Sequence, residues 1–238
     1  MFEYVYKHKD KDDNPTGEET KYIVGYYGSI ELHSAYAEMV RLTSIADAID
    51  GLIWLGQNDF VPPLPYRRGS SGTASVTNKE NRKQDALDEY RDLILGQKNI
   101  LVFVPAKNEN AEDKLVAFMS FRHDCDIRDF LSKDVKAGDK INYVTTIIVH
   151  PEHRRRGLTS KLYDYMESLL PTSVHAKCVS TRTWHTNTAH NKLLEKKGYE
   201  LTCTLHGQRE YDGNPYDTVF YCKLADREQE AIRRIHGV

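Results

Sequence analysis

A strand pattern that runs directly into a helix pattern is the feature of this sequence that most constrains its fold. The β-branched run INYVTTIIV at residues 141–149 has the length and composition of a buried strand. After the polar segment HPEHRRRG, apolar residues recur at helical spacing before Pro171: Leu158, Leu162, Met166, Leu169 and Leu170. We therefore expect a turn where unpaired N–H groups and the helix dipole favour an anion.

Strand and helix patterns alternate along most of the chain. Residues 2–9 and 20–27 are aromatic and β-branched and flank a polar turn, which predicts a hairpin. Two helices are expected at 32–55 and 77–95, with a Pro- and Gly-containing loop at 56–76 between them. Further strands are expected at 100–106, 115–121, 175–183, 199–206 and 217–224, and a short helix at 188–197. This order predicts an α/β protein with a mixed sheet.

Charge and composition exclude several classes of partner. The 33 Lys and Arg residues against 35 Asp and Glu give a net charge of -2, so no global field would gather nucleic acid or an anionic membrane. No stretch reaches transmembrane length and no apolar leader is present, which predicts a cytoplasmic protein. The four cysteines form no CxxC pair, so neither a zinc knuckle nor a disulfide framework is indicated. His150 and His153 have HxxH spacing without an evident third ligand, so no metal is expected.

Three consecutive arginines precede the glycine that opens the predicted helix. An isolated run such as Arg154, Arg155 and Arg156 is usually a solvated basic face. Its place just before Gly157 favours phosphate binding, because glycine lets the backbone approach an anion closely and arginine adds charge that can pair with it. A pyrophosphate would satisfy the unpaired N–H groups of this turn.

The segment resembles the CoA pyrophosphate loop of the GNAT acyltransferase superfamily, which reads V-x-P-x-x-R-x-x-G-x-(G/A) after a strand. Val149, Pro151, Arg154 and Gly157 fall in register with that motif. Thr159 stands where the family usually has a small residue, and its hydroxyl is a further donor for phosphate.

A second segment, NTAHNKLLEKKGYE at 187–200, is similar to the fourth helix of the same family. Asn187 and the Gly198-Tyr199 pair match, while His190 stands at the usual alanine. Leu194 stands at the tyrosine that many members use to protonate the departing thiolate. We therefore expect no single indispensable general acid, with Tyr163 and Tyr199 as the nearest alternatives in the sequence.

The resemblance implies a fold and an activity. The expected fold is a single GNAT-like domain over 1–238, with a mixed, mostly antiparallel central sheet flanked by helices and with splayed central strands. Residues 1–28 would be a hairpin extension and 100–224 the CoA-binding and catalytic core. The implied activity is transfer of an acetyl or similar acyl group from acyl-CoA to a small-molecule or peptide amine, by direct attack in a ternary complex. The alternative is a non-catalytic acyl-CoA-binding regulatory or sensor module; a monomer or homodimer is expected.

The resemblance also assigns roles to residues. The cofactor-binding set is Ile147, Ile148, Val149, Arg154, Arg155, Arg156, Gly157, Leu158, Thr159, Asn187 and His190. The backbone N–H near Val149 would stabilise the oxyanion of the tetrahedral intermediate. Tyr143 and Thr145 stand on one strand face where members often carry a base, or they only line the cleft.

Two further groups have open alternatives. His185 either reaches the substrate channel or serves in packing or capping. Glu210, Asp212 and Asp217 crowd the turn between the last two strands, where they would either recognise the amine acceptor or remain solvated turn acids.

Overall fold

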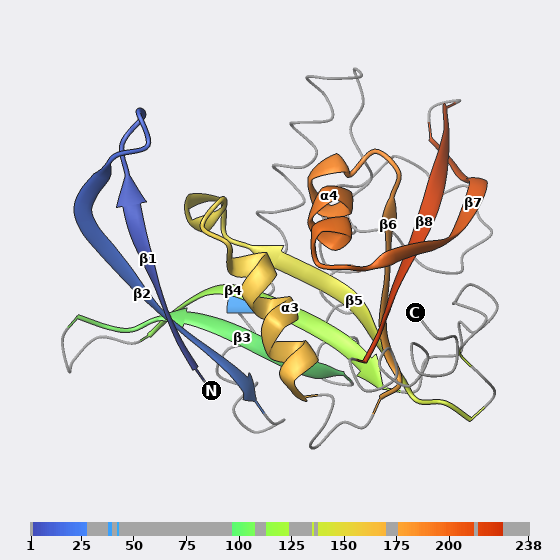
Figure 1. Cartoon of the computed structure of the whole chain (residues 1–238), viewed down its shortest axis with the longest axis horizontal. Helices are drawn as coiled ribbons and strands as arrows, with labels where there is room; N and C mark the ends of the chain where they lie inside the picture. The colour runs from blue at the N-terminus through green and yellow to red at the C-terminus, as the bar shows by residue number, and fades with distance from the viewer. Residues whose placement is uncertain are drawn as a thin grey trace, which may run out of the picture. The chain divides into compact units, whose positions relative to one another are not determined.

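A computed structural model describes residues 2–27, 38–39, 42, 97–107, 113–123, 135, 138–169, 176–211 and 214–225 (Figure 1). Its elements are β1 (Phe2–Lys9), β2 (Pro15–Tyr27), β3 (Lys98–Val104), β4 (Lys114–His123), β5 (Ile141–Val149), the 3₁₀ turn η2 (Pro151–His153), α3 (Leu158–Leu169), β6 (Cys178–Trp184), α4 (Thr188–Lys196), β7 (Glu200–Tyr211) and β8 (Asn214–Leu224). The loop at 56–76 and the helix at 77–95 lie outside the described residues, and of the helix at 32–55 only Glu38, Met39 and Leu42 are described, all helical.

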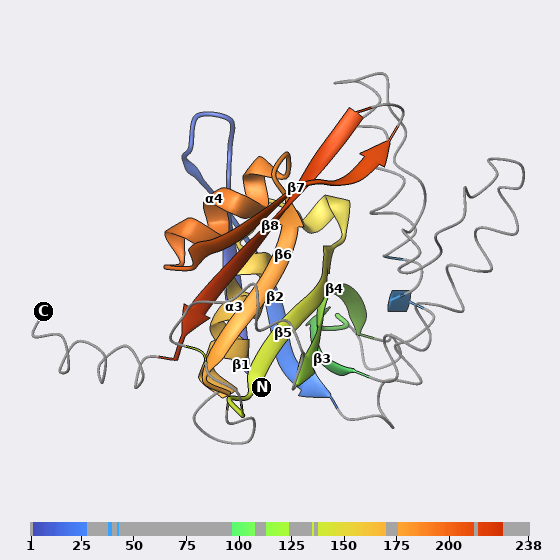
Figure 2. The same ribbon diagram turned by 90° about the vertical axis from the view of Figure 1, so that its right-hand side faces the viewer.

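The strands form one mixed sheet in the order β1-β2-β3-β4-β5-β6-β8-β7. The β5–β6 pair is parallel, whereas β1–β2, β2–β3, β6–β8 and β7–β8 are antiparallel. Pairing between β5 and β6 runs only from Ile141–Cys178 to Val144–Thr181, although both strands continue further. Figure 2 shows β6, β8 and β7 side by side. The predicted mixed, mostly antiparallel sheet with splayed central strands is confirmed.

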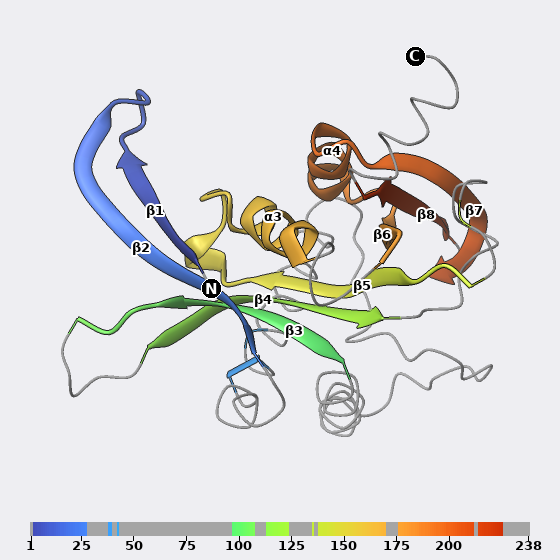
Figure 3. The same ribbon diagram turned by 60° about the horizontal axis from the view of Figure 1, so that its bottom comes forward.

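The described residues fall into two compact units, and the first comprises Met1–Phe118 with Ile148–Leu158. Its core is an apolar cluster of Met39, Leu42, Leu101, Leu115, Phe118 and Ile148. The predicted hairpin is present as β1 and β2, which Figure 3 shows as a curved pair. Because β2 begins at Pro15, the expected start at residue 20 is wrong. The Asp10 carboxylate closes the turn early by accepting the N–H groups of Asp12 and Asn14 at 2.8 and 2.9 Å.

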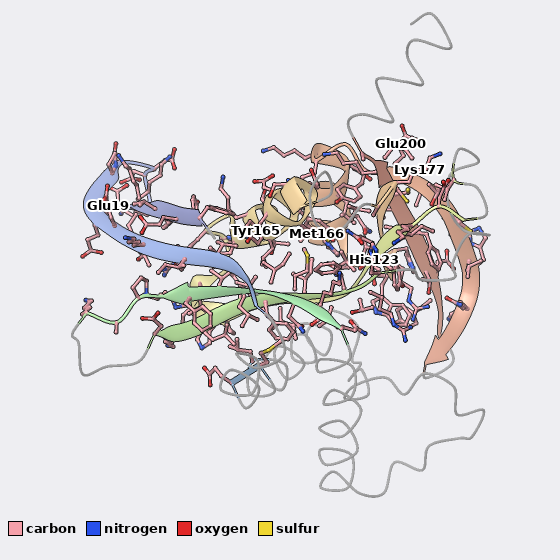
Figure 4. All side chains as sticks on the ribbon, turned by 90° about the horizontal axis from the view of Figure 1, so that it is seen from below. Glu19, His123, Tyr165, Met166, Lys177 and Glu200 are labelled. Atoms are coloured by element: carbon pink, nitrogen blue, oxygen red, sulfur yellow. The ribbon has the colours of Figure 1, made fainter. Side chains whose placement is uncertain are left out.

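The second unit comprises Met119–Ile147 with Thr159–Val238. Ile141, Cys178 and Cys222 form an apolar cluster in it, and both cysteines are free thiols. On α3, Met166 is fully buried and Tyr165 beside it is half-buried (Figure 4). The expected single domain stays a prediction.

The short helix α4 begins at the predicted Thr188 and ends at Lys196, one residue before the predicted end. Asn187 caps its first turn by accepting the N–H of His190, and Gly198 follows its last turn with a φ of +79°. Among the described residues, no helix is long and apolar enough to cross a bilayer.

Candidate functional site

The turn between β5 and α3 is fixed to the strand beside it. The N–H of His150 donates to the Val116 carbonyl of β4 at 2.8 Å. Pro151 opens η2, and the Nδ1 atom of His150 accepts the N–H of Glu152 at 3.3 Å. The loop therefore starts from a rigid point as it leaves the sheet.

Two residues of this loop adopt the left-handed backbone conformation. Arg155 has a φ of +60° and Gly157 a φ of +77°. That conformation costs a residue with a side chain about 1–2 kcal/mol, so an arginine keeps it only where its surroundings hold it. Arg154 before them is extended, with a φ of -67° and a ψ of 163°. Successive N–H groups in a turn conformation can form a concavity that binds anions.

The backbone N–H groups at the start of α3 are candidate anion donors. Within the part of the chain that the structure describes, no residue accepts a hydrogen bond from the N–H groups of residues 155–159. Leu158 and Thr159 belong to the first turn of α3, where N–H groups have no acceptor within the helix. These are the positions that the sequence predicts for the pyrophosphate.

The three arginines differ in their surroundings. Arg154 donates from Nε to the Val149 carbonyl at 3.2 Å, and Arg156 donates from Nη1 to the hydroxyl of Tyr22 at 2.9 Å. Arg155 is exposed. A guanidinium carries five N–H groups, and the bond to Tyr22 uses one of those of Arg156.

Tyrosines of the β1–β2 hairpin contact the same loop, which sequence reasoning missed. The hydroxyl of Tyr4 donates to the Arg156 carbonyl at 2.8 Å, and the hydroxyl of Tyr22 lies 3.0 Å from Nδ1 of His153. Burial, with the nearby Arg156, lowers the pKa of His153 to about 4. The neutral ring can therefore accept the Tyr22 proton at Nδ1, while Tyr22 accepts from Arg156. The sequence feature that could have indicated this contact is the recurrence of tyrosines on one face of the predicted hairpin.

A third possible metal ligand, Glu152, lies near His150 and His153, so the expectation that no third ligand is present is wrong. The side chains of His150, Glu152 and His153 bring one possible metal-ligand atom each to within 4.8 Å of one another. The Nδ1 atoms of both histidines already have protein partners, and the positive charges of Arg156 and Lys114 act on His153. These features disfavour a cation, and the absence of a metal stays a prediction.

The separation of β5 from β6 begins at two predicted site residues. Tyr143 pairs with Ser180, one position before the last β5–β6 pair, and is 1% exposed. This burial favours a position in the protein interior over the role of a base. Thr145 lies just past the last pair and donates from its hydroxyl to the Ser120 carbonyl at 3.1 Å. Across the last pair, Thr181 donates to the Val144 carbonyl at 3.2 Å. The Nδ1 atom of His123 on β4, labelled in Figure 4, lies 2.8 Å from Oδ1 of Asn142. The sequence analysis did not single out this histidine.

The α4 residues divide between capping and burial. Asn187 accepts the His190 N–H at 3.4 Å and donates to the Thr183 hydroxyl at 3.2 Å, so it caps the helix. Leu194, at the family's acid position, is fully buried. Nε2 of His190 lies 3.1 Å from the hydroxyl of Tyr163, and burial lowers the pKa of His190 to about 4.

Tyr199, the other candidate acid, belongs to an ion-pair cluster. Its hydroxyl donates to Oε1 of Glu167 at 3.0 Å, and Lys223 donates to Oε2 of the same carboxylate at 2.7 Å. Burial and the Glu167 charge raise the pKa of Tyr199 well above its usual value. This arrangement fits a structural role.

Two predicted site residues, His185 and Asp217, contact each other. The N–H of His185 donates to the Asp217 carbonyl at 3.1 Å, and the N–H of Asp217 donates to Nδ1 of His185 at 3.1 Å. The Asp217 carboxylate accepts the Gly207 N–H at 2.9 Å and lies 3.0 Å from His206 Nδ1, and these bonds lower its pKa. Asp217 therefore ties β7 to β8. The side chain of Glu210 and all of Asp212 lie outside the described residues.

The sequence model of the acetyltransferase (GNAT) family matches residues 71–199, more than half of the chain. The chain belongs to this family. No curated protein matches the chain. The resemblance of the loop and α4 segments to GNAT motifs is thereby confirmed at the level of the family.

Solved structures share the GNAT fold at low identity. NAA60 of Arabidopsis thaliana with acetyl-CoA aligns at 11% identity and a TM-score of 0.52, over 85% of this chain and 98% of that one. YncA of Salmonella typhimurium with acetyl-CoA aligns at 15% identity and 0.51, over 86% and 94%. RimL, a ribosomal L7/L12 alpha-N-protein acetyltransferase in complex with coenzyme A, aligns at 13% and 0.51, over 86% and 94%.

Proposed function

We propose that this chain is an acyl-CoA-dependent N-acyltransferase that binds the CoA pyrophosphate on the backbone of Arg155 to Thr159. The observation that carries the proposal is the row of N–H groups at 155–159 for which no described residue is an acceptor, with left-handed residues at Arg155 and Gly157. A diphosphate would accept several of these N–H groups, and the helix dipole of α3 would add attraction. The Thr159 hydroxyl and the exposed Arg155 side chain would add hydrogen bonds and charge.

The acyl-pantetheine arm would follow the end of β5, past Ile147, Ile148 and Val149. The β5–β6 separation beyond Val144 supports this path, because strands that part leave backbone groups free to bond a ligand. The thioester oxygen would accept the Val149 N–H, which would stabilise the oxyanion. The neighbouring N–H of His150 is already engaged with the Val116 carbonyl.

Transfer would proceed by direct attack of a neutral amine on the thioester carbon. The C–S bond then breaks, the amine loses its proton to a base or water, and the CoA thiolate takes up a proton. A thiol with a reference pKa of about 8.5 leaves readily near neutral pH, so a buried leucine at position 194 is compatible with turnover.

A second candidate function is a non-catalytic acyl-CoA-binding module. It is favoured by the full burial of Leu194 and the 1% exposure of Tyr143, because neither position then offers an acid or base to a ligand. In that case the protein would bind CoA, but no amine acceptor would cause release of the CoA thiol.

A thiol-release assay with acetyl-CoA tests the two functions against each other. The acceptor panel contains small amines and peptides with free N-termini, since the neighbouring RimL structure is that of an alpha-N-protein acetyltransferase. Amine-dependent thiol release, with acetylated product seen by mass spectrometry, is expected. CoA binding by calorimetry without release on any acceptor would instead support the binding module, and no CoA binding at all would overturn both.

A further inference from the structure

Three tyrosines on one face of the β1–β2 hairpin, Tyr4, Tyr6 and Tyr22, contact the loop between β5 and α3. Tyr4 and Tyr22 are directly opposed in the ladder, and their rings stack at 6.0 Å. Tyr6 follows Tyr4 on the same face of β1, whereas Glu3 and Val5 are exposed on the other face. The hairpin thus presents a block of phenols to the loop.

These tyrosines hold Arg156 at both its backbone and its side chain. The Tyr4 hydroxyl donates to the Arg156 carbonyl at 2.8 Å, and the Arg156 guanidinium donates to the Tyr22 hydroxyl at 2.9 Å. The same guanidinium lies 5.6 Å from the centre of the Tyr6 ring, within cation–π range. Arg156 lies between the two left-handed residues, Arg155 and Gly157, so contacts that fix it constrain the backbone on both sides.

Fixing the Arg156 carbonyl also fixes the next N–H group. The carbonyl of residue 156 and the N–H of Gly157 belong to one planar trans peptide unit, so they point in opposite directions. When Tyr4 holds the carbonyl toward the hairpin, the Gly157 N–H points away from it. That N–H belongs to the 155–159 group, from which no described residue accepts a hydrogen bond.

We propose that Tyr4 and Tyr22 are positioning residues of the CoA site, and that the hairpin sets the affinity for the pyrophosphate without touching it. This inference rests on the proposed function, because it requires that the loop binds CoA. It assigns a role to residues 1–28, which the family resemblance implies are only a hairpin extension. A loop held in its binding conformation avoids the entropic cost of ordering when the ligand arrives.

Removal of the Tyr4 hydroxyl is the direct test. Tyr4→Phe keeps the ring stacked on Tyr22 but deletes the donor to the Arg156 carbonyl. We expect CoA to bind about threefold to tenfold more weakly by calorimetry. Pantetheine, which lacks the pyrophosphate, should bind as it does to the parent protein, and kcat at saturating acetyl-CoA should be retained. Glu3→Gln is the matched control, since Glu3 pairs with Lys21 on the opposite face of the same hairpin.

A double-mutant cycle separates positioning from general weakening of the hairpin. A Cβ added at Gly157 would lie 3.3 Å from the Tyr4 hydroxyl oxygen. Gly157→Ala should therefore reduce CoA affinity less in the Tyr4→Phe background than in the parent, because the close contact is gone. Strictly additive losses would contradict a direct link between the two residues.

The outcomes distinguish this inference from the proposed function. A parent protein that binds no CoA would overturn the proposed function and this inference with it. If the parent binds CoA and a folded Tyr4→Phe binds it equally well, only the positioning role is overturned. Equal losses for CoA and pantetheine would also overturn that role. Should Tyr4→Phe fail to fold, Tyr22→Phe, which removes the acceptor of Arg156, is judged by the same criteria.

Discussion

The hydroxyl of Tyr163 on α3 lies 3.1 Å from Nε2 of His190 on α4. Burial lowers the pKa of His190 to about 4, below its usual value of 6.5, and raises the pKa of Tyr163 above its usual range. Both groups are therefore neutral near pH 7. The pair is a polar link between two helices that carry GNAT motifs.

The neutral His190 predicts acid sensitivity. Its folded pKa lies below its unfolded value, so the unfolded chain binds a proton that the native protein does not, and the free energy of unfolding falls as the pH drops from about 6.5 to about 4. Urea denaturation across this range should show that decline, and His190→Gln should make it shallower. His153 contributes in the same direction and stays in both proteins. Equal slopes for parent and variant would contradict the assignment.

The pH profile of kcat should rise and then level off. The rise reflects deprotonation of the amine or its base. A basic limb from a tyrosine is not expected, because burial raises the pKa of Tyr163 and of Tyr199 above the usual range. Steady-state rates between pH 6 and pH 10 test this expectation. A basic limb that vanishes in Tyr163→Phe would identify that residue as the acid.

Restoring the family's tyrosine at position 194 should not restore an acid. Leu194 is fully buried, so the larger phenol of Leu194→Tyr would overpack its surroundings and cost about 1–3 kcal/mol of stability. We expect a lower denaturation midpoint and no gain in kcat. A variant of parent stability with faster turnover would show that the phenol reaches the thiolate.

Gly157→Val should weaken CoA binding by about tenfold or more, because position 157 is left-handed and an added Cβ would lie only 3.3 Å from the Tyr4 hydroxyl. Gly17→Val is the matched control. Gly17 has a similar φ of +82° but nothing within 4 Å of an added Cβ, and it lies near the start of β2. Calorimetry on both folded variants should show a loss only for Gly157→Val. Equal affinities would remove the loop from the CoA site.

The acids of the last turn should separate in their effects. Asp217→Asn loses a charge that bonds Gly207 and lies against His206, so it should lower stability more than Glu210→Gln or Asp212→Asn. If the turn recognises the amine, Glu210→Gln and Asp212→Asn should raise the acceptor KM while leaving the melting temperature near that of the parent. Unchanged KM values in both would leave the turn without that role.

Local patterns in the sequence were enough to predict the strand-to-helix turn and the elements around it. Periodicity placed β5 at 141–149 with its observed bounds, and the Asn187 and Gly198 signals placed α4. The start of β2 was misplaced because one carboxylate, that of Asp10, decides the length of the turn. Side-chain links such as Tyr4 to Arg156 could not be predicted, since a contact separated by 152 residues has no local signature.

The same separation has a consequence for how the protein folds. A loop whose conformation depends on a residue 152 positions earlier cannot form until both segments exist and the chain has closed a long loop. During synthesis at about 5–20 residues per second, Tyr4 would wait roughly 8–30 s for its partner. The loop at 155–159 should therefore mature late, so that, if it binds CoA, the appearance of CoA affinity in a refolding experiment marks the end of folding.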